Sequence, residues 1–119
     1  MSRNEGFTEY IIEDVLGHIN GISRKALFSG HGVYLDGVIV GIIIDGAFYL
    51  KANPKMMERY MQEGGEPFKY EREGKDNKSS KTIIMPYISV PIEILEDREA
   101  IKERVYESFD ISNKNKKSL

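Results

Sequence analysis

The chain has 119 residues and a mass of 13.6 kDa, which suits one compact domain because a chain this short rarely divides into two cores. It contains 17 Lys and Arg residues and 19 Asp and Glu residues, which give a net charge of −2 and a pI of about 5.7. This balance lacks the strong basic excess expected of a nucleic-acid-binding protein. Because Lys114, Lys116 and Lys117 lie near the end, residues 1–113 carry 14 basic groups against the same 19 acidic ones, or −5.

Cysteine is absent, which excludes disulfides, thiolate metal sites and thiol nucleophiles. The first residues lack the apolar core of a signal peptide. The longest apolar run, Val38–Ile44, is far shorter than the roughly twenty residues of a membrane-spanning helix. We therefore expect a cytoplasmic protein without a membrane span.

The first elements are a helix and a strand. Apolar residues at helical spacing predict a helix over residues 7–19, and Asn20-Gly21 supplies its end. A short strand is expected over Lys25–Ser29. The glycines of Gly30-His31-Gly32 indicate a bend or a bulge after it.

Two Asp-Gly pairs interrupt the most apolar part of the chain. Asp36-Gly37 and Asp45-Gly46 each separate two apolar runs, and Asp-Gly in this position is a strong hairpin signal because both central residues of a type I′ turn need a positive φ. The spacing predicts an antiparallel meander over residues 25–51.

The second half begins with a capped helix. Asn53-Pro54 reads as an N-cap followed by proline at the first helical position, so a helix is predicted over 54–63. A strand follows around Phe68–Tyr70. The charged stretch Glu71–Lys81 has no periodicity and is interpreted as a mobile loop between two strands.

A second strand and a final helix complete the pattern. The strand is expected over Thr82–Val90, where Pro86 favours an edge position or a bulge. Asp97 caps a helix over 98–109, and residues from Asn113 onward read as a frayed end. We thus expect one domain over residues 1–110 and a flexible tail over 111–119.

Together these elements predict an α+β fold, with an antiparallel sheet of about five strands flanked by three helices. Val38–Ile44 does not fit a two-layer arrangement, because both of its faces are apolar. Either helices cover both sides of this strand, or a helix covers one side and the loop the other. The alternative is that another subunit or a partner covers one face.

Few residues indicate chemistry. His18 and His31 are far from metal-ligand spacing, and no Gly-x-Ser-x-Gly elbow surrounds a serine. Gly30-His31-Gly32 lacks the lysine and the following helix of a phosphate-binding loop. We therefore expect no catalytic residues, no metal site and no cofactor.

Aromatic residues and one lysine leave alternatives open. The aromatics could suggest base stacking, but an RNA-binding basic and aromatic pattern is missing, so core packing is the interpretation. Lys51 follows an apolar run and either is buried and functional or guards a sheet edge. The aromatics concerned are Phe28, Tyr34, Tyr49, Phe68, Tyr70 and Tyr87.

Five short motifs then occur in a recognisable order and resemble the N-terminal domain of the TfoX/Sxy family over about residues 6–109. The family pattern reads roughly Met-Phe-Gly-Gly-x-Gly-x-Tyr, an x-Asp-Gly turn, Leu-Tyr-Leu-Lys, Pro-Phe-x-Tyr, and a late Tyr followed by Pro-x-Glu-x-Leu-Glu-Asp. The corresponding residues here are Leu27–Gly37, Phe48–Lys51, Glu66–Tyr70, Met85–Tyr87 and Pro91–Asp97.

The resemblance implies a secretion-chaperone-like α+β domain without known enzymatic activity, here in a stand-alone version that lacks the family's C-terminal domain. Its larger members regulate natural competence and act with the cyclic-AMP receptor protein at promoters, which implies a transcription-related, protein-binding role.

The resulting hypothesis is a non-enzymatic domain that meets a protein partner, with a transcription regulator as one candidate, through its sheet and the region around Tyr34, Lys51 and Tyr70. The acidic body favours a protein over direct contact with nucleic acid. A homodimer is compatible with the apolar strand. The alternative is a small-molecule-binding domain with cryptic enzymatic activity.

Overall fold

The computed structural model describes residues 5–27, 29–74 and 80–117. It is an α+β domain built on an open antiparallel sheet of six strands in the order β1-β2-β3-β4-β6-β5. The predicted fold class is confirmed, with six strands in place of about five. In chain order the elements are α1 (Glu5–Glu9), η1 (Tyr10–Val15), β1 (Ile22–Leu27), β2 (Gly30–Leu35), β3 (Val38–Ile44), β4 (Ala47–Lys51), α2 (Pro54–Met61), β5 (Pro67–Glu73), β6 (Ser80–Ser89), α3 (Ile92–Leu95) and α4 (Arg98–Lys117).

The meander forms as its turn residues predict. Asp36 and Asp45 have φ values of 50° and 53°, and the glycines that follow them have φ values of 82° and 71°. This pair of left-handed residues is the type I′ geometry that matches strand twist. β1 to β4 are therefore consecutive antiparallel neighbours.

Several boundaries differ from the expectation. The helix expected over 7–19 is α1 followed by η1 and ends at Val15, and the strand expected over Lys25–Ser29 is β1, Ile22–Leu27. Gly30-His31-Gly32 forms the start of β2 in place of a bend, and the irregularity lies further on, between Val33 and Tyr34. α4 continues to Lys117 in place of ending near residue 109, so the tail expected over 111–119 is helical as far as Lys117. The Ser112 hydroxyl anchors this extension by donating to the carbonyl of Ile39, and the Ser108 hydroxyl one turn earlier donates to the carbonyl of Lys51.

The expected loop over Glu71–Lys81 is largely paired strand. Glu71, Arg72 and Glu73 lie opposite Thr82, Lys81 and Ser80, so the β5–β6 pairing continues as far as Glu73 and Ser80. The charged residues gave no periodic signal because both faces of this part of the hairpin are exposed to solvent. Residues 75–79 lie outside the described part of the chain.

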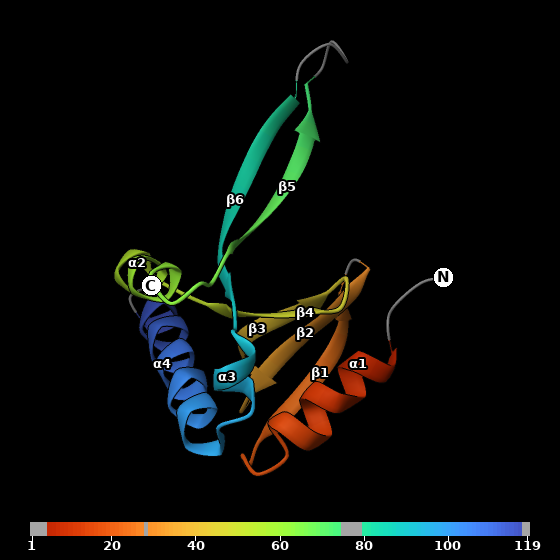
Figure 1. The fold of residues 1–119 in the computed structure, drawn as a ribbon, viewed down its shortest axis with the longest axis vertical. Helices are drawn as coiled ribbons and strands as arrows, with labels where there is room; N and C mark the ends of the chain where they lie inside the picture. The colour runs from red at the N-terminus through yellow and green to blue at the C-terminus, as the bar shows by residue number, and fades with distance from the viewer. Residues whose placement is uncertain (1–4, 28, 75–79, 118–119) are drawn as a thin grey trace.

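β5 and β6 form an arm that stands away from the rest of the domain (Figure 1). β4 pairs with β6 only over Tyr87–Ser89, so the rest of β6 pairs with β5 alone. Pro86 was expected at an edge or a bulge, and the register between the two strands shifts beside it, opposite Phe68. Its carbonyl still accepts a hydrogen bond from the Ala52 amide at 2.9 Å. The arm lies along the 48 Å long dimension of the molecule.

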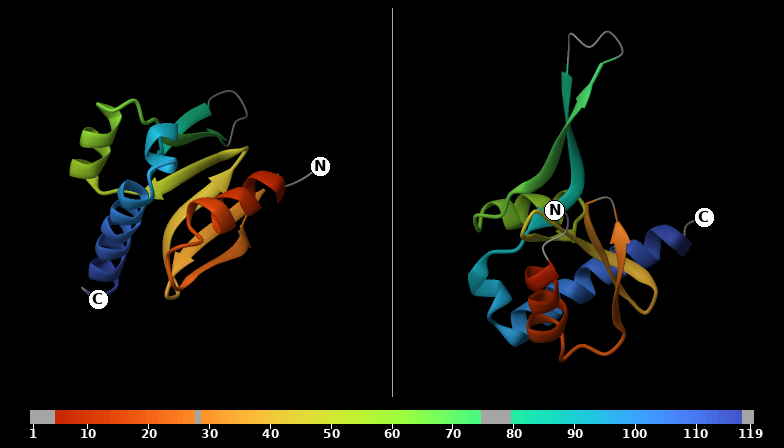
Figure 2. Two further views of the ribbon diagram at one scale, coloured as in Figure 1. Left: turned by 60° about the horizontal axis from the view of Figure 1, so that its bottom comes forward. Right: turned by 90° about the vertical axis from the view of Figure 1, so that its right-hand side faces the viewer.

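The main core lies between the meander and the helices. Ile11 and Leu16 come from the first helical segment, Ile101 and Val105 from α4, and all four are fully buried against β2, β3 and β4. Figure 2 shows α1 and α4 lying against the meander, and its right-hand view shows the arm standing clear of these two helices. We call this side of the sheet the helical face.

A bulge decides which side of the sheet each residue of Val38–Ile44 faces. Val33 lies opposite Gly41 but Tyr34 lies opposite Ile39, which leaves Val40 as an extra residue in β3. The extra residue reverses the alternation, so Val40 joins the helical core together with Ile43. The neighbouring isoleucines belong to a cluster on the other side, which contains Leu27, Ile39, Ile42, Ile44, Tyr49, Phe68, Met85 and Tyr87.

Every member of that second cluster comes from a strand. Within the part of the chain that the structure describes, no helix residue belongs to it, so helices on both sides of the strand is the wrong interpretation. Ile42, Ile44 and Tyr87 are nevertheless buried by their strand neighbours. We call this side of the sheet the open face.

Candidate functional site

The open face carries a row of aromatic side chains. Tyr49 of β4 packs against Phe68 of β5 with ring centroids 5.2 Å apart and ring planes at 63°, and Phe68 lies 6.4 Å from Tyr70. The row therefore runs from the meander onto the arm. Burial raises the pKa of Tyr49, and the nearby carboxylates of Asp45 and Glu66 raise it further.

Tyr34 adds a second aromatic position on the same face. Its ring lies across Gly32, where a Cβ would approach the ring to 3.0 Å, so glycine makes room for the ring. The Lys25 ammonium lies 5.4 Å from the ring centroid, within cation–π distance. Burial raises the pKa of Tyr87, and Tyr34 contributes to the same shift.

Charge is divided between the two faces. β1, β2, β3, β4 and β6 contain no Asp or Glu. Glu71 and Glu73 of β5 alternate with Tyr70 and Arg72, so they lie on the opposite side of the arm. By strand register, the open face carries the basic residues Lys25, Lys51, Arg72 and Lys81.

The helices carry the opposite balance. Acidic side chains predominate over basic ones in the described helices up to Asn113, which accounts for the negative charge of the body. The open face therefore presents aromatic and mainly basic groups, with the Asp45 carboxylate beside Tyr49, although the protein as a whole is acidic. The acidic helical residues are Glu5, Glu9, Glu13, Asp14, Glu58, Glu93, Glu99, Glu103, Glu107 and Asp110.

A groove of about 430 Å³ lies at the base of the arm. Its lining is mostly apolar and comes from the open face, with polar groups at its rim. It is bounded by Ser29, Ile44, Asp45, Phe68, Lys69, Tyr70 and Met85. The groove is thus a shallow receptor for an apolar side chain or a small apolar ligand.

The three predicted interaction residues lie on this one face. Tyr34 and Tyr70 lie at opposite ends of the aromatic positions, and Lys51 lies beside Tyr87 across the β4–β6 pair. Lys51 does not guard an edge, because β4 pairs on both sides. Their functional role stays a prediction, but the sheet brings them to a common surface.

The expectation of core packing holds for only part of the aromatic set. Tyr87 is buried and Tyr34, Tyr49 and Phe68 are half-buried, whereas Tyr70 is 44% exposed. Phe28 lies outside the described residues. The exposed and half-buried rings line the open face because no described helix covers them.

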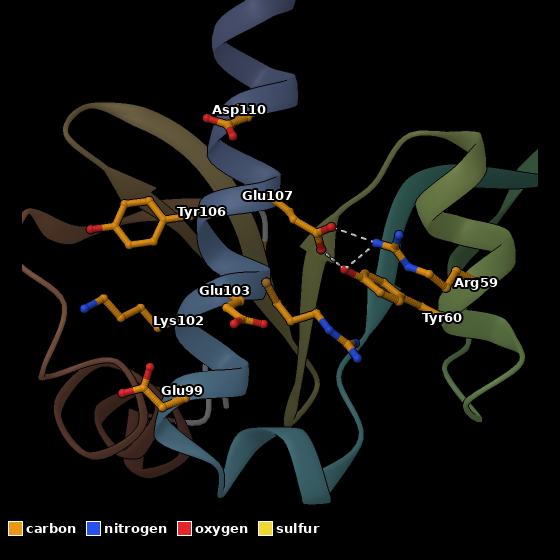
Figure 3. Close-up of a pocket in the computed structure, with 9 residues that line it drawn as sticks. Arg59, Tyr60, Glu99, Lys102, Glu103, Tyr106, Glu107 and Asp110 are labelled. Carbon is orange, nitrogen blue, oxygen red and sulfur yellow. Dashed lines mark hydrogen bonds and ion pairs between the residues drawn. The ribbon is translucent and has the colours of Figure 1, made fainter.

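A larger hollow of about 590 Å³ lies between α2 and α4 (Figure 3). Here the Tyr60 hydroxyl donates to Glu107 and accepts from Arg59, and Arg59 pairs with Glu107 at 2.8 Å. Burial is the main cause that raises the pKa of Tyr60, and the hydrogen bond to Glu107 adds to it. Lys102 points from α4 away from Tyr60 (Figure 3).

Arg104 completes this contact between α2 and α4. Its guanidinium lies 4.0 Å from the centroid of the Tyr60 ring and 2.7 Å from a Glu63 oxygen. The charged groups around Tyr60 are thus paired with one another. This arrangement joins α2, and with it the start of the arm, to α4.

The two histidines hold the first helical segment in place. His31 is buried, with Nδ1 3.3 Å from the Thr8 hydroxyl and Nε2 3.7 Å from a Glu5 oxygen. His18 Nε2 donates to the carbonyl of Arg98 at 3.0 Å, at the start of α4.

Over the described ranges, no group of three or more His, Cys, Asp or Glu side chains could hold a metal ion. None of the helices described is long and apolar enough to cross a membrane.

The model of one protein family, the TfoX N-terminal domain, matches residues 14–111. The chain belongs to this family. The match includes all six strands and most of α4, so the open face and the arm are parts of the TfoX N-terminal domain itself. No curated protein matches the chain. Family membership supports a competence-regulator-like domain.

Sequence reasoning missed Lys25, Phe68, Arg72 and Lys81 as members of the candidate surface. Only the pairing register shows that they share a face with Tyr34 and Tyr70. The one signal that could have found them was the absence of acidic residues from most of the apolar, strand-forming segments. Averaging charge over the whole chain concealed it.

Proposed function

We propose that this TfoX N-terminal domain is a non-enzymatic, cytoplasmic interaction module that acts on transcription through a protein partner. The observation that carries the proposal is the open face, where aromatic and basic side chains gather on a sheet that no described helix covers. Aromatic residues that are partly exposed are typical of interface cores.

The chemistry of the face also indicates which partner fits. The strands place four basic side chains and no acidic one on that face, so it is complementary to an acidic surface of a partner. The four are Lys25, Lys51, Arg72 and Lys81. Between them lie apolar residues such as Ile39, Ile83 and Met85, which accept apolar side chains of a protein. The negative charge of the rest of the domain disfavours the backbone of a nucleic acid. We therefore propose a protein surface that combines acidic and apolar residues, and not a nucleic acid.

The remaining charged groups support a structural role and not a chemical one. Arg59, Tyr60 and Glu107 satisfy one another, and both histidines have partners in the fold. A general acid or base needs a group with a free lone pair or proton facing a substrate. In the α2–α4 hollow, Tyr60, Arg59 and Glu107 are already engaged with one another.

The test uses charge reversal on each face of the full chain. The double variant Lys25→Glu/Lys51→Glu is compared with Lys102→Glu, an exposed lysine of α4 that serves as the matched control. Nuclease-treated cell extract is passed over each immobilised protein, and a captured protein is then purified and titrated against the same variants.

We expect the double variant to lose at least tenfold in affinity for the purified partner and the Lys102 variant to retain it. Equal affinity of both variants would remove the open face from the proposal. Tight binding of the pure chain to duplex DNA at physiological salt would overturn a role through a protein partner.

A second candidate function rests on the groove at the base of the arm. Its apolar lining and volume suit a small ligand, although Lys51 is not among the residues that bound it. Native mass spectrometry of the chain purified from cells tests this candidate. A bound small molecule that disappears in Met85→Arg would support it, and an unliganded chain would contradict it.

A further inference from the structure

The sheet ends on one side in β5, whose outer edge has no strand beside it among the described residues. Beyond Phe68 the arm consists of β5 and β6 alone. A two-stranded hairpin is marginally stable in water, and a free edge is a template for another strand. Tyr70 and Ile84 are 44% and 62% exposed on this arm.

The sequence of β5 is complementary to itself when two copies run antiparallel. The strand spans residues 67–73, so Tyr70 is its centre. With Tyr70 opposite Tyr70 of a second copy, Lys69 of each strand lies opposite Glu71 of the other. Opposite charges placed directly across an antiparallel pair stabilise it.

The other side of the arm is complementary in the same register. Phe68 lies opposite Arg72 of the second copy, which places a guanidinium beside an aromatic ring twice in the pair. The two Tyr70 rings meet at the two-fold axis, where each would lose exposed surface. Both sides of the strand therefore favour one register, as an isologous interface requires.

The opposite edge of the sheet provides the contrast. β1 carries Arg24 and Lys25 at its centre, so antiparallel pairing of two copies about either residue places that cation against itself. Charged residues on edge strands commonly prevent such pairing. β1 follows that rule, whereas β5 alternates the sign of its charges in an order that attracts its own copy.

We propose that two copies of this chain pair through the outer edges of β5, antiparallel and centred on Tyr70, to join their sheets into one. This pairing uses the outer edge of β5, whereas the protein partner proposed above meets the side of the sheet; Tyr70 and Arg72 belong to both surfaces. Coverage of one face of Val38–Ile44 by another subunit was one alternative that the sequence left open; the β5 edge is a different surface, and its charges are complementary.

The test is a charge exchange in the full chain, measured by analytical ultracentrifugation. Lys69→Glu places two carboxylates opposite each other at both charged positions of the pair, and Glu71→Lys places two ammonium groups there. Each single variant should therefore weaken the dimer by about tenfold or more. The double variant Lys69→Glu/Glu71→Lys restores opposite charges and should dimerise as the native chain does.

Mixing the two single variants gives the most specific result. Every pair between a Lys69→Glu chain and a Glu71→Lys chain is again opposite in charge, so we expect a heterodimer from two chains that are monomeric alone. Lys102→Glu serves as the control with a charge change outside the edge, and circular dichroism shows that each variant is folded.

A native chain that stays monomeric up to millimolar concentration would overturn the pairing. So would a dimer that neither single variant weakens, or a mixture of the single variants that forms no heterodimer. Partner capture by the open face is measured separately with the Lys25→Glu/Lys51→Glu variant, so failure of one proposal leaves the other tested on its own terms.

Discussion

The two faces of the sheet differ in how far their side chains are buried and in whether their polar groups have partners within the domain. On the helical face, Ile11, Ile101 and Val105 are fully buried. Tyr60 is hydrogen-bonded to Arg59 and Glu107, which form an ion pair with each other. On the open face, half-buried rings lie beside lysines in a sheet that no described helix covers. One face therefore maintains the fold, and the other leaves partly exposed side chains for a partner.

The largest expected difference between the faces is in core truncation. Ile101→Ala removes a fully buried side chain and should lower the free energy of unfolding by about 3 kcal/mol, because a cavity remains. Ile39→Ala, at a half-buried position of the open face, should cost about 1 kcal/mol. Urea unfolding of both variants measures this, and equal costs would mean that the open face is a core in its own right.

A smaller effect is expected where α2 meets α4. Tyr60→Phe removes one hydroxyl but leaves Arg59 paired with Glu107, so the free energy of unfolding should fall by only about 1 kcal/mol. Capture of a partner by the open face should not change. If capture falls with this variant, the α2–α4 contact takes part in binding and the division between the faces fails.

Alkaline pH should affect both faces through their tyrosines. Burial raises the pKa values of Tyr49, Tyr60 and Tyr87 above the ordinary value of 10.0, so folding favours their neutral forms. Their contribution to stability is complete below about pH 10 and is lost as the pH rises through the folded-state pKa values. Urea unfolding followed across that range should show the decline.

The Tyr60→Phe variant separates the two faces in this pH experiment. It removes the contribution from the helical face and leaves those of Tyr49 and Tyr87. A smaller alkaline decline is therefore expected. An unchanged decline would show that Tyr60 titrates alike in the folded and unfolded states.

The smallest effect on stability is expected at Gly32. A Cβ there would approach the Tyr34 ring to 3.0 Å, and the ring can turn aside, so Gly32→Ala should change the free energy of unfolding by no more than about 0.5 kcal/mol. The displaced ring should leave the Lys25 ammonium. NMR contacts between Lys25 and Tyr34 would report the change, and their persistence would show that the ring is held by other neighbours.

Local signals were sufficient for most elements. The two Asp-Gly turns and the Asn53 cap depend on residues next to them, and both features form as predicted, with the Asn53 side chain accepting from the Met56 amide. The length of the arm and the end of α4 were not predictable. The arm depends on cross-strand pairing of Glu71 and Arg72 with Thr82 and Lys81, which the residues next to them in the chain do not specify.

The candidate surface was predicted only in outline. Tyr34, Lys51 and Tyr70 share the open face, as the hypothesis of one interaction region requires, but Lys51 lies in an internal strand where an edge was considered. The negative net charge calculated for residues 1–113 describes the domain as a whole, but it does not describe the open face, where basic side chains gather. Net charge contains no information about which side of a sheet a residue occupies.

The α+β class, the meander and the absence of thiol chemistry followed from the amino-acid sequence alone, because turn geometry, periodicity and composition are local or additive properties. Which residues share a surface depended on the tertiary structure. The bulge at Val40 reverses the alternation within β3, and strand register carries Lys25, Lys51 and Arg72 to one side. A face is defined by pairing between strands and by packing, which no local pattern encodes.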